Sequence, residues 1–431
     1  MTESLLDFFN NQGIESFLST FWILVFVEVP RFFLGGLVVL MMLLFSKRAR
    51  YTPEDLRNIG REILHNGVSV VISSHNDAAS LEPMIISLRE QTVRKIQIII
   101  VNDGSTDGTH NECLRLRRAK KIDTYIHLKA RGGKASAVNL ALSYVKYDFF
   151  VVTDADTSFD RDAFEIAAAY FCDPRVGAVG GNLAVRNYKA SLAARVQQIN
   201  YLLSITLGRI VSDMLGLYFV ASGAFGFYRK AATESLGGWE LGPGEDGDIA
   251  TRLRLGGWKV RFSPYAVAQT DVPDTELKLI KQRLRWNRSL IRLRFRKYRW
   301  HVLNPFNANF NMSLAIGFFD IYIFTALQPF LFVAFLIEKM IVFGFFSVYI
   351  LISVSLIFIL LDGLKILLSY TISKKIYRDY SLLDYIPLYT FYNVYFLRFV
   401  RLIAISHELM FRGSYTDDYV PEKVRLQQKV Y

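Results

Sequence analysis

The stretch "DFFVVTDADT", residues 148–157, decides the fold class that the sequence predicts. It opens with an uninterrupted apolar run, which is typical of a strand buried on both faces of a parallel sheet. Asp154 and Asp156 follow where this run ends. Since residues two apart on a strand point the same way, their carboxylates repel each other unless a cation or a proton lies between them. The pair predicts a site for a hard divalent cation, Mg²⁺ or Mn²⁺; the alternative is a polar turn whose aspartate caps the next helix.

Strand runs and helical patterns alternate on both sides of this stretch. "VSVVISSH" (68–75) and "KIQIIIVND" (95–103) are apolar runs, and the segment between them has helical spacing. The alternation predicts an α/β fold with a parallel, doubly wound sheet. Ligands of such sheets bind beyond the carboxyl ends of the strands. Polar residues follow the strand runs at that edge: Asn76, Asp77, Asp103, Asp154 and Asp156.

Two glycine-containing segments follow further strands. "VNDGSTDGT" (101–109) either places the Asp103 carboxylate on a nucleobase or ribose, or is a plain turn in which Asp103 or Ser105 caps a helix. "ARGGKASAVNLAL" (130–142) puts Lys134 at a predicted helix N-terminus, where phosphate binds favourably, although a solvated loop fits equally well. The segment is not a Walker A motif, because its spacing differs.

An acidic group opens another predicted helix in "GPGEDGDIATRLRLGGWKV", residues 242–260. One interpretation is purely structural, because acids at a helix N-terminus complement the helix dipole. A carboxylate placed there, at Glu245 or Asp246, can also take a proton from an attacking hydroxyl.

The composition points to a membrane. The chain has 431 residues, a net charge of +12, 52% hydrophobic residues and a mean hydropathy of +0.23. An apolar region at 17–45 is followed at once by "KRAR" (47–50), while the tail before it has no Lys or Arg. The positive-inside rule then predicts an outside N-terminus and cytoplasmic residues after 46. We expect no cleaved signal peptide, because a basic n-region and a small-residue cleavage site are missing.

A second apolar block begins near Met312 and holds two runs that each exceed the roughly 20 residues needed to cross a bilayer. "EKM" (338–340) is expected to be a tight outside turn between them, and "SKKIYRDY" (373–380) to return inside. The stretch 385–405 either spans the membrane or lies in its interface. The expectation is a multi-pass protein of the cell (inner) membrane, with its middle region in the cytoplasm.

"KQRLRWNRSLIRLRFRKYRWH", residues 281–301, has nine Lys or Arg and no acid. Its position just before the apolar block favours a helix in the membrane interface. A nucleic-acid-binding patch is a weaker interpretation of this basic segment, so no nucleic-acid partner is expected.

The ordered set VNDGSTDGT, DAD, GED and QRLRW resembles the inverting family-2 glycosyltransferases, specifically their membrane-embedded processive synthases of cellulose, chitin, hyaluronan and poly-N-acetylglucosamine. The resemblance covers about 60–300 and implies a GT-A fold and a UDP-sugar donor. It implies that Asp103 contacts uridine, that Asp154 lies by the diphosphate and that Asp156 binds the metal. "SSHND" and Gly244 depart from the family pattern, and the first departure leaves details of nucleotide contact open.

The resemblance also implies roles for the residues near the acceptor. Asp246 would be the catalytic base with Glu245 beside it. Gln282 and Arg285 would lie near the diphosphate with Lys134, and Trp286 would stack on the acceptor sugar. The implied organisation is a tail and transmembrane helix (1–50), a GT-A domain (51–275), basic interfacial helices (276–310), transmembrane or interfacial helices (311–405) and a C-terminal tail (406–431).

The leading hypothesis is a processive synthase that polymerises a β-linked polysaccharide from UDP-GlcNAc and exports it through its own channel. Its implied partners are the donor, the growing polysaccharide, the lipid bilayer and an accessory export subunit. The alternatives are a single-sugar transferase acting on a lipid phosphate, a β-glucan synthase using UDP-glucose, and an inactive scaffold with a transferase fold.

Overall fold

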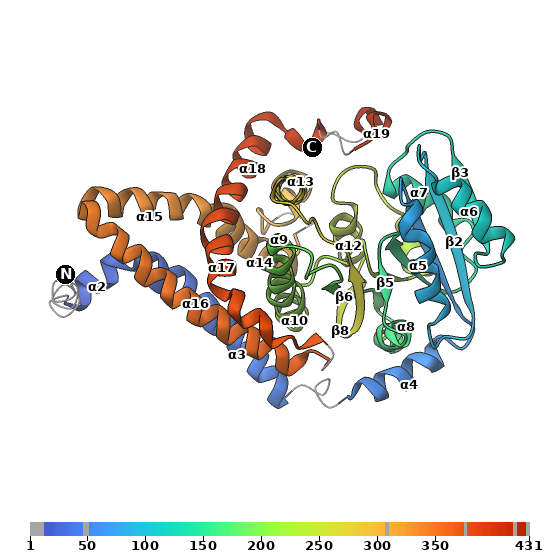
Figure 1. The fold of residues 1–431 in the computed structure, drawn as a ribbon, viewed down its shortest axis with the longest axis horizontal. Helices are drawn as coiled ribbons and strands as arrows, with labels where there is room; N and C mark the ends of the chain where they lie inside the picture. Colours follow the sequence, from blue (N-terminus) through green and yellow to red (C-terminus); the bar gives the residue numbers. More distant parts are fainter. Residues whose placement is uncertain (1–12, 46–50, 307–309, 375–376, 417–419, 428–431) are drawn as a thin grey trace.

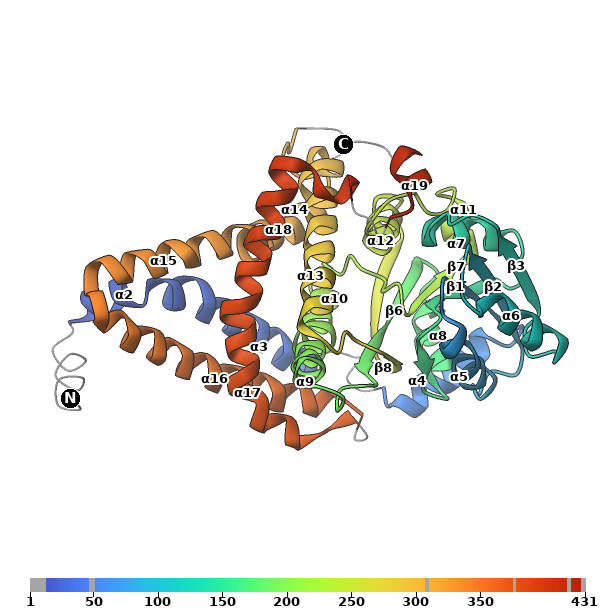
Figure 2. The same cartoon turned by 45° about the horizontal axis from the view of Figure 1, so that its top comes forward.

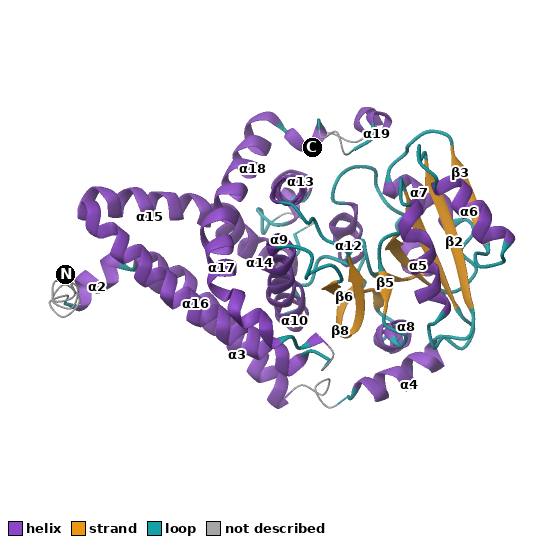
Figure 3. Ribbon diagram, viewed as in Figure 1, coloured by secondary structure: helices purple, strands orange, loops and turns teal. Residues whose placement is uncertain are grey.

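The computed structural model describes residues 13–45, 51–306, 310–374, 377–416 and 420–427. An α/β domain built on one sheet lies at one end, and an arm of long helices extends from it (Figure 1). Figure 3 shows that the strands are confined to the α/β domain, whereas the arm is helical.

The sheet has eight strands in the order β3-β2-β1-β4-β7-β6-β8-β5. Their bounds are β1 Val68–Ser74, β2 Ile96–Asp103, β3 Thr124–Leu128, β4 Phe149–Asp154, β5 Ser158–Phe159, β6 Val176–Val185, β7 Gly226–Arg229 and β8 Lys259–Thr270. β1 pairs in parallel with both β2 and β4, and β2 pairs in parallel with β3. This half of the sheet is the parallel, doubly wound arrangement that the alternating pattern predicts.

The other half corrects the expectation of an all-parallel sheet. β7 is antiparallel to both β4 and β6, and β5 is antiparallel to β8. The physical reason is the connection: β7 returns from a helical excursion that leaves the sheet, so no crossover helix forces it to run parallel. β7 is four residues long, too short for a periodic signal.

Helices cover both faces of the sheet, which explains the apolar runs of its central strands. Val70 and Ile72 of β1 lie in one buried cluster, whereas Val71 between them lies in the cluster on the opposite face. The helices of this part are α4 Pro53–Ile63, α5 Ala78–Arg89, α6 Thr109–Arg118, α7 Lys134–Leu142, α8 Ala163–Ala168, α9 Leu192–Asn200, η4 Tyr201–Leu207, α10 Gly208–Met214, α11 Lys230–Glu234 and α12 Glu245–Leu255.

A further group of helices connects the domain to the arm. α13 (Glu276–Ile291) continues into η5 (Arg292–Lys297) and packs against α18 (Leu397–Phe411). Figures 1 and 2 both show α13 between α18 and α12. α13 therefore links the sheet domain to the helical part.

The arm consists of α2 Ile14–Thr20, η1 Leu24–Glu28, α3 Val29–Phe45, α14 Met312–Ile321, η7 Tyr322–Leu327, α15 Gln328–Phe343 and α16 Ser347–Ile372. Two helical segments are long and apolar enough to cross a membrane by length and composition: Leu24–Met41 and Met312–Ile372. The stretch 385–405 is helical in α17 (Ile386–Phe391), η11 (Tyr392–Phe396) and α18. The "KRAR" flank lies outside the described residues.

The expected turn at "EKM" is wrong. Glu338–Met340 continues α15, and the chain turns at Gly344–Phe346, where Gly344 has a φ of 51°. The two charges are held by the N-terminal segment instead. Lys339 Nζ donates to Ser19 O at 2.9 Å, and Trp22 Nε1 donates to Glu338 Oε2 at 3.0 Å. Because both charges have partners, they do not need a solvent-exposed turn.

Candidate active site

The carboxyl edge of the parallel strands brings three predicted residues together. Asp103 ends β2 and Asp154 ends β4, the two strands that flank β1. In the register of β1 with β4, Ser73 lies opposite Asp154. Asp156 follows two residues later, in the turn before β5. The structure thus places these aspartates at the edge where ligands of doubly wound sheets bind.

Asp103 holds the glycine loop that precedes α7. Its two carboxylate oxygens accept hydrogen bonds from the backbone N–H groups of Gly132 at 2.6 Å and Gly133 at 2.7 Å. The alternative that Asp103 or Ser105 caps α6 is wrong, since that helix starts at Thr109 without a side-chain cap. Asp103 is buried, and each of its oxygens keeps a second lone pair for another donor.

Lys134, the first residue of α7, lies against Asp154. Its ammonium donates to the Asp154 carboxylate and, at 2.8 Å, to the carbonyl of Gly223. Burial works against the charged form, yet the carboxylates of Asp154, Glu245 and Asp246 raise the pKa of Lys134 overall. A fixed positive charge therefore sits at the helix N-terminus, beside the carboxylates that the sequence analysis singled out.

Asp156 lies in an environment that suits a cation. Burial, followed by the charges of Asp154 and Asp77, raises the pKa of Asp156 to about 6. A divalent ion bound beside Asp156 would offset the repulsion that this carboxylate feels from its neighbours. The described residues contain no group of three or more His, Cys, Asp or Glu that could enclose a metal. Asp154 and Asp156 would supply carboxylate oxygens to a hard divalent ion such as Mg²⁺, which commonly binds through one or two carboxylates and substrate phosphates.

Asp77 is a neighbour of this pair whose role the sequence did not define. Burial raises its pKa, and the charges of Asp154 and Asp107 add to that effect. Its Oδ2 accepts from His75 N at 2.7 Å. The signal in the sequence is its place after β1, which it shares with several polar residues.

Glu245 and Asp246 open α12 and face the same region from the other side. Gly244 before them has a φ of 82°, a left-handed conformation that favours glycine. Burial, followed by the charge of Asp246, raises the pKa of Glu245 to about 7, although Lys134 opposes the effect. A carboxyl group with a pKa near neutrality can exchange a proton at physiological pH.

α13 presents the Q-x-x-R-W residues towards α12. A Cβ added to Gly244 would lie 3.2 Å from Cβ of Ser289, so the two helices meet there. Gln282, Arg285 and Trp286 precede Ser289 by seven, four and three residues, which places them on the same side of the helix. Trp286 is 40% exposed.

The second half of the basic segment differs from the expected interfacial helix. Arg292, Leu293 and Arg294 are buried within the protein. Arg296 Nη1 donates to Glu408 Oε1 at 2.7 Å, and Lys297 pairs with Glu240 and Asp248. These cations are neutralised by carboxylates far away in the sequence, and that pairing is why they lie inside the protein.

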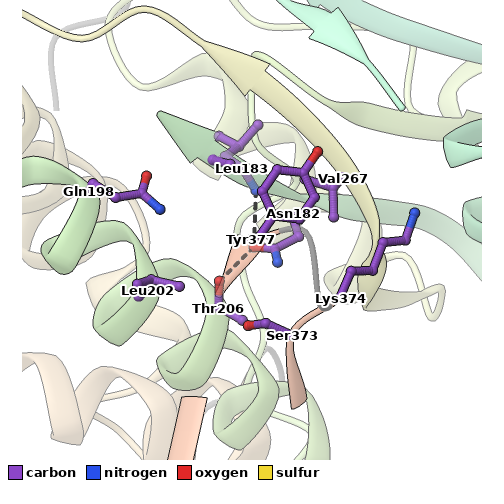
Figure 4. A pocket seen from close by; sticks show the side chains of 10 residues that line it. Asn182, Leu183, Gln198, Leu202, Thr206, Val267, Ser373, Lys374 and Tyr377 are labelled. Atoms are coloured by element: carbon purple, nitrogen blue, oxygen red, sulfur yellow. Dashed lines mark hydrogen bonds between the residues drawn. The ribbon is translucent and has the colours of Figure 1, made fainter. Parts of the chain in front are cut away.

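Figure 4 shows a small cavity of about 10 Å³ elsewhere in the structure. Polar side chains of Asn182, Thr206 and Tyr377 line it, and the Thr206 hydroxyl donates to Asn182 Oδ1 at 2.9 Å. Its size suits one water molecule. None of the predicted site residues lines it, so it is separate from the candidate active site.

The sequence model of glycosyl transferase family 2 matches residues 69–236, which include Asp103, Lys134, Asp154 and Asp156. The poly-beta-1,6-N-acetyl-D-glucosamine synthase of Staphylococcus aureus (strain COL) is 30% identical over 244 residues, 56% of this chain and 58% of that protein. The synthase of the same name from Staphylococcus epidermidis is 29% identical over 222 residues, 51% of this chain and 53% of that protein. The chain thus spans little more than half the length of these curated relatives.

Among solved structures, the mannosyltransferase PcManGT from Pyrobaculum calidifontis, in complex with GDP-Man and Mn²⁺, has a similar fold. The TM-score is 0.53 at 18% identity, over 84% of this chain and 99% of that one. This likeness concerns the fold alone, which is α/β and GT-A-like. The chain thus has a region, residues 69–236, that matches the model of glycosyl transferase family 2, and its sequence is similar to two staphylococcal poly-beta-1,6-N-acetyl-D-glucosamine synthases.

Proposed function

We propose that this chain is an inverting glycosyltransferase that polymerises a β-linked polysaccharide from a UDP-sugar, with UDP-GlcNAc as the donor. The observation that carries the proposal is the meeting of Asp154, Lys134 and Glu245 at one sheet edge of a family 2 domain. The donor sugar is inferred from the two staphylococcal relatives named above.

The leaving group of this reaction is a diphosphate, whose charge must be neutralised as the bond breaks. Lys134 supplies one fixed positive charge beside Asp154, and Arg285 of α13 supplies another. Asp156 would hold a divalent ion, Mg²⁺ or Mn²⁺, which when bound supplies Lewis-acid stabilisation of the diphosphate. Asp103 would hold the uridine end of the donor while it fixes the glycine loop.

The proton of the acceptor hydroxyl goes to the carboxylates at the start of α12. The hydroxyl oxygen attacks the anomeric carbon, the bond from that carbon to the diphosphate oxygen breaks, and Asp246 takes the proton as UDP leaves. Direct displacement inverts the anomeric centre, so an α-linked donor gives a β-linked product. Glu245, with its pKa near neutrality, is a second group that can hold the proton.

The helical arm would place this reaction at a cell membrane. Leu356 and Leu360 of α16 are 61% and 64% exposed, and Ile341 of α15 is 78% exposed. Apolar side chains presented outwards along helices of spanning length suit a lipid environment. The proposal includes a cytoplasmic α/β domain and export of the product through the helical part.

Release of UDP by the purified protein tests the donor. We expect UDP release from UDP-GlcNAc in the presence of Mn²⁺, with less from UDP-glucose or UDP-glucuronate, and no release after addition of EDTA. Equal turnover in EDTA would contradict the metal site. Transfer of one sugar only, to a lipid phosphate, would replace polymerisation by the alternative reaction.

Cys172 is a natural reporter of topology, because it is exposed on the α/β domain while Cys113 is buried. An impermeant maleimide should label Cys172 in permeabilised cells and leave it unlabelled in intact cells. The Cys172→Ser variant gives the background. Labelling of Cys172 in intact cells would contradict a cytoplasmic domain.

A further inference from the structure

The turn that carries Asp156 is held by a side chain from another part of the sheet. Arg186 follows the last residue of β6, and Asp271 follows the last residue of β8. These two strands run in parallel, and their final residues, Val185 and Thr270, are register partners. β5 pairs with β8 on its other side, so the ends of β6 and β8 meet the turn between β4 and β5 (Figure 1).

The guanidinium of Arg186 joins three segments at this place. Its Nε and Nη2 donate to the two carboxylate oxygens of Asp271, at 3.1 and 2.6 Å. Nη2 also donates to the backbone carbonyl of Asp156 at 2.8 Å, and Nη1 donates to the Ser158 hydroxyl at 3.2 Å. A planar guanidinium offers several donors in a fixed arrangement, so it can hold all these acceptors at once.

The Asp156 carboxylate is oriented by hydrogen bonds to one of its two oxygens. Thr157 Oγ1 and Thr270 Oγ1 donate to Asp156 Oδ1, at 3.2 and 3.3 Å. No residue in the described part of the chain donates a hydrogen bond to Asp156 Oδ2, so this oxygen keeps its lone pairs for a cation. Because Arg186 holds the backbone of the same turn, the position of Oδ2 depends on Arg186 as well.

Stability does not explain the pair of Arg186 and Asp271. The two side chains are 35% and 44% exposed, and ion pairs between exposed side chains contribute little to the free energy of unfolding. The pair acts on its neighbour instead, since Arg186 contacts the backbone of the proposed metal ligand. The like charges of Asp154 and Asp156 repel each other, so an anchored turn keeps Asp156 in place before a cation binds.

We propose that Arg186, fixed by Asp271, is a positioning residue that keeps Asp156 oriented for a divalent ion. The proposal rests on the proposed function and deepens it, because it assigns what holds the metal ligand of that site. Arg186 takes no part in bond making or breaking. Its effect falls on the affinity for the metal and leaves the chemical step at saturating metal unchanged.

The test measures binding of Mn²⁺ to the purified chain in the presence of UDP, from the electron paramagnetic resonance signal of free Mn²⁺. Arg186→Met should raise the Kd for Mn²⁺ by about 10- to 100-fold, the range expected when a residue that orients a metal ligand is removed. Arg186→Lys should give a smaller rise, because lysine keeps the charge but loses the planar fork. At saturating Mn²⁺, both variants should keep a kcat close to the wild-type value.

Arg175→Met is the matched control. Arg175 also donates from Nε and Nη2 to the two oxygens of one aspartate, Asp173, at 3.1 and 3.2 Å. It directly precedes β6, whereas Arg186 directly follows that strand, so the two arginines lie at opposite ends of the same strand. We expect the wild-type Kd for Mn²⁺ in this variant.

A wild-type Kd for Mn²⁺ in Arg186→Met would overturn the role of Arg186 and leave the proposed function intact. If Arg186→Met fails to fold, Asp271→Asn decides the matter, since it frees the same guanidinium and should also raise the Kd. An equal rise in Arg175→Met would overturn the role too, because a general loss of order would then explain both. Absence of sugar transfer by wild-type protein that binds Mn²⁺ would overturn the proposed function alone, and absence of Mn²⁺ binding would overturn both.

Discussion

The two halves of the basic segment are both rich in Lys and Arg but lie in different environments. In the first half, residues 281–291, Gln282 Oε1 is buried without a hydrogen-bond partner among the described residues, and Arg283 covers the ring of Trp286. In the second half, residues 292–301, Arg294 donates to Thr251, Arg296 to Glu408 and Lys297 to Glu240. The second half is therefore distinguished by ion pairs, since Arg296 and Lys297 contact carboxylates of the protein interior.

The difference shows that charge density alone does not locate a helix. The sequence favoured an interfacial helix because this segment, with nine cations and no acid, lies just before the apolar block. Glu408 lies 112 residues from its partner Arg296, and Asp248 lies 49 residues from Lys297. Such long-range pairs determine which cations face a ligand and which support the protein interior.

The same division recurs on α12, and it gives the largest expected effect. Asp246 faces the candidate site, whereas Asp248, two residues later, pairs with Lys297 and accepts from the Tyr298 hydroxyl at 2.6 Å. Asp246→Asn should lower the rate of transfer by about 10² to 10⁴ with little change in UDP affinity or melting temperature. Asp248→Asn should lower the melting temperature and change the rate of transfer much less. Equal behaviour of the two variants would remove the distinction between catalytic and structural acids.

The next largest expected effect is a loss of stability when an ion pair in the second half of the basic segment is broken. Arg296→Met leaves Glu408, whose side chain is fully buried, without its cationic partner. The loss should be about 3–5 kcal/mol in the free energy of unfolding, as for other broken buried pairs. The exposed Arg299→Met serves as the control in chemical denaturation. If both variants unfold at the wild-type denaturant concentration, the second half is not structural.

The raised pKa of Glu245 should make the stability of the protein depend on pH. Its pKa of about 7 is above the value in an unfolded chain, so the native state holds a proton that the unfolded state has lost between about pH 4.5 and 7. Stability from this group therefore falls as pH rises through that range. Glu245→Gln should be more stable than the wild type by about 1–3 kcal/mol at pH 8 and equal to it at pH 4.5. A constant difference between the two proteins across this range would contradict the assignment.

The smallest expected effect concerns the two exposed tryptophans of the basic segment. Trp286→Ala should raise the acceptor KM about three- to tenfold, the range expected for loss of one stacking contact, with an unchanged melting temperature. Trp300→Ala should leave the KM unchanged, because Trp300 lies in the second half. A similar change in both variants would indicate a shared role as surface anchors.

Much of the sheet edge could be predicted from local sequence. β1, β2 and β4 are long apolar runs, and the carboxyl ends of parallel strands must meet, so Asp103 and Asp154 were expected to lie together. The starts of α7 at Lys134 and of α12 at Glu245 followed from glycines before helical patterns. These features depend on neighbours in the chain, which a sequence displays directly.

The rest depends on contacts between distant segments. β7 is antiparallel because of how the chain returns to the sheet, and its four residues carry no period. Lys339 can be buried because its ammonium donates a hydrogen bond to the carbonyl of Ser19, 320 residues away. Nothing local distinguishes Tyr201 from other aromatic residues, yet it is buried within electrostatic reach of both Asp156 and Arg283.

The length of the product made by the purified chain in lipid nanodiscs is the most direct test of polymerisation. With UDP-GlcNAc and Mn²⁺, we expect UDP release coupled to long β-linked chains, with both lost in the Asp246→Asn variant and retained in Arg299→Met. Products that carry a single transferred sugar, or polymer yield at the wild-type level from well-folded Asp246→Asn protein, would contradict it.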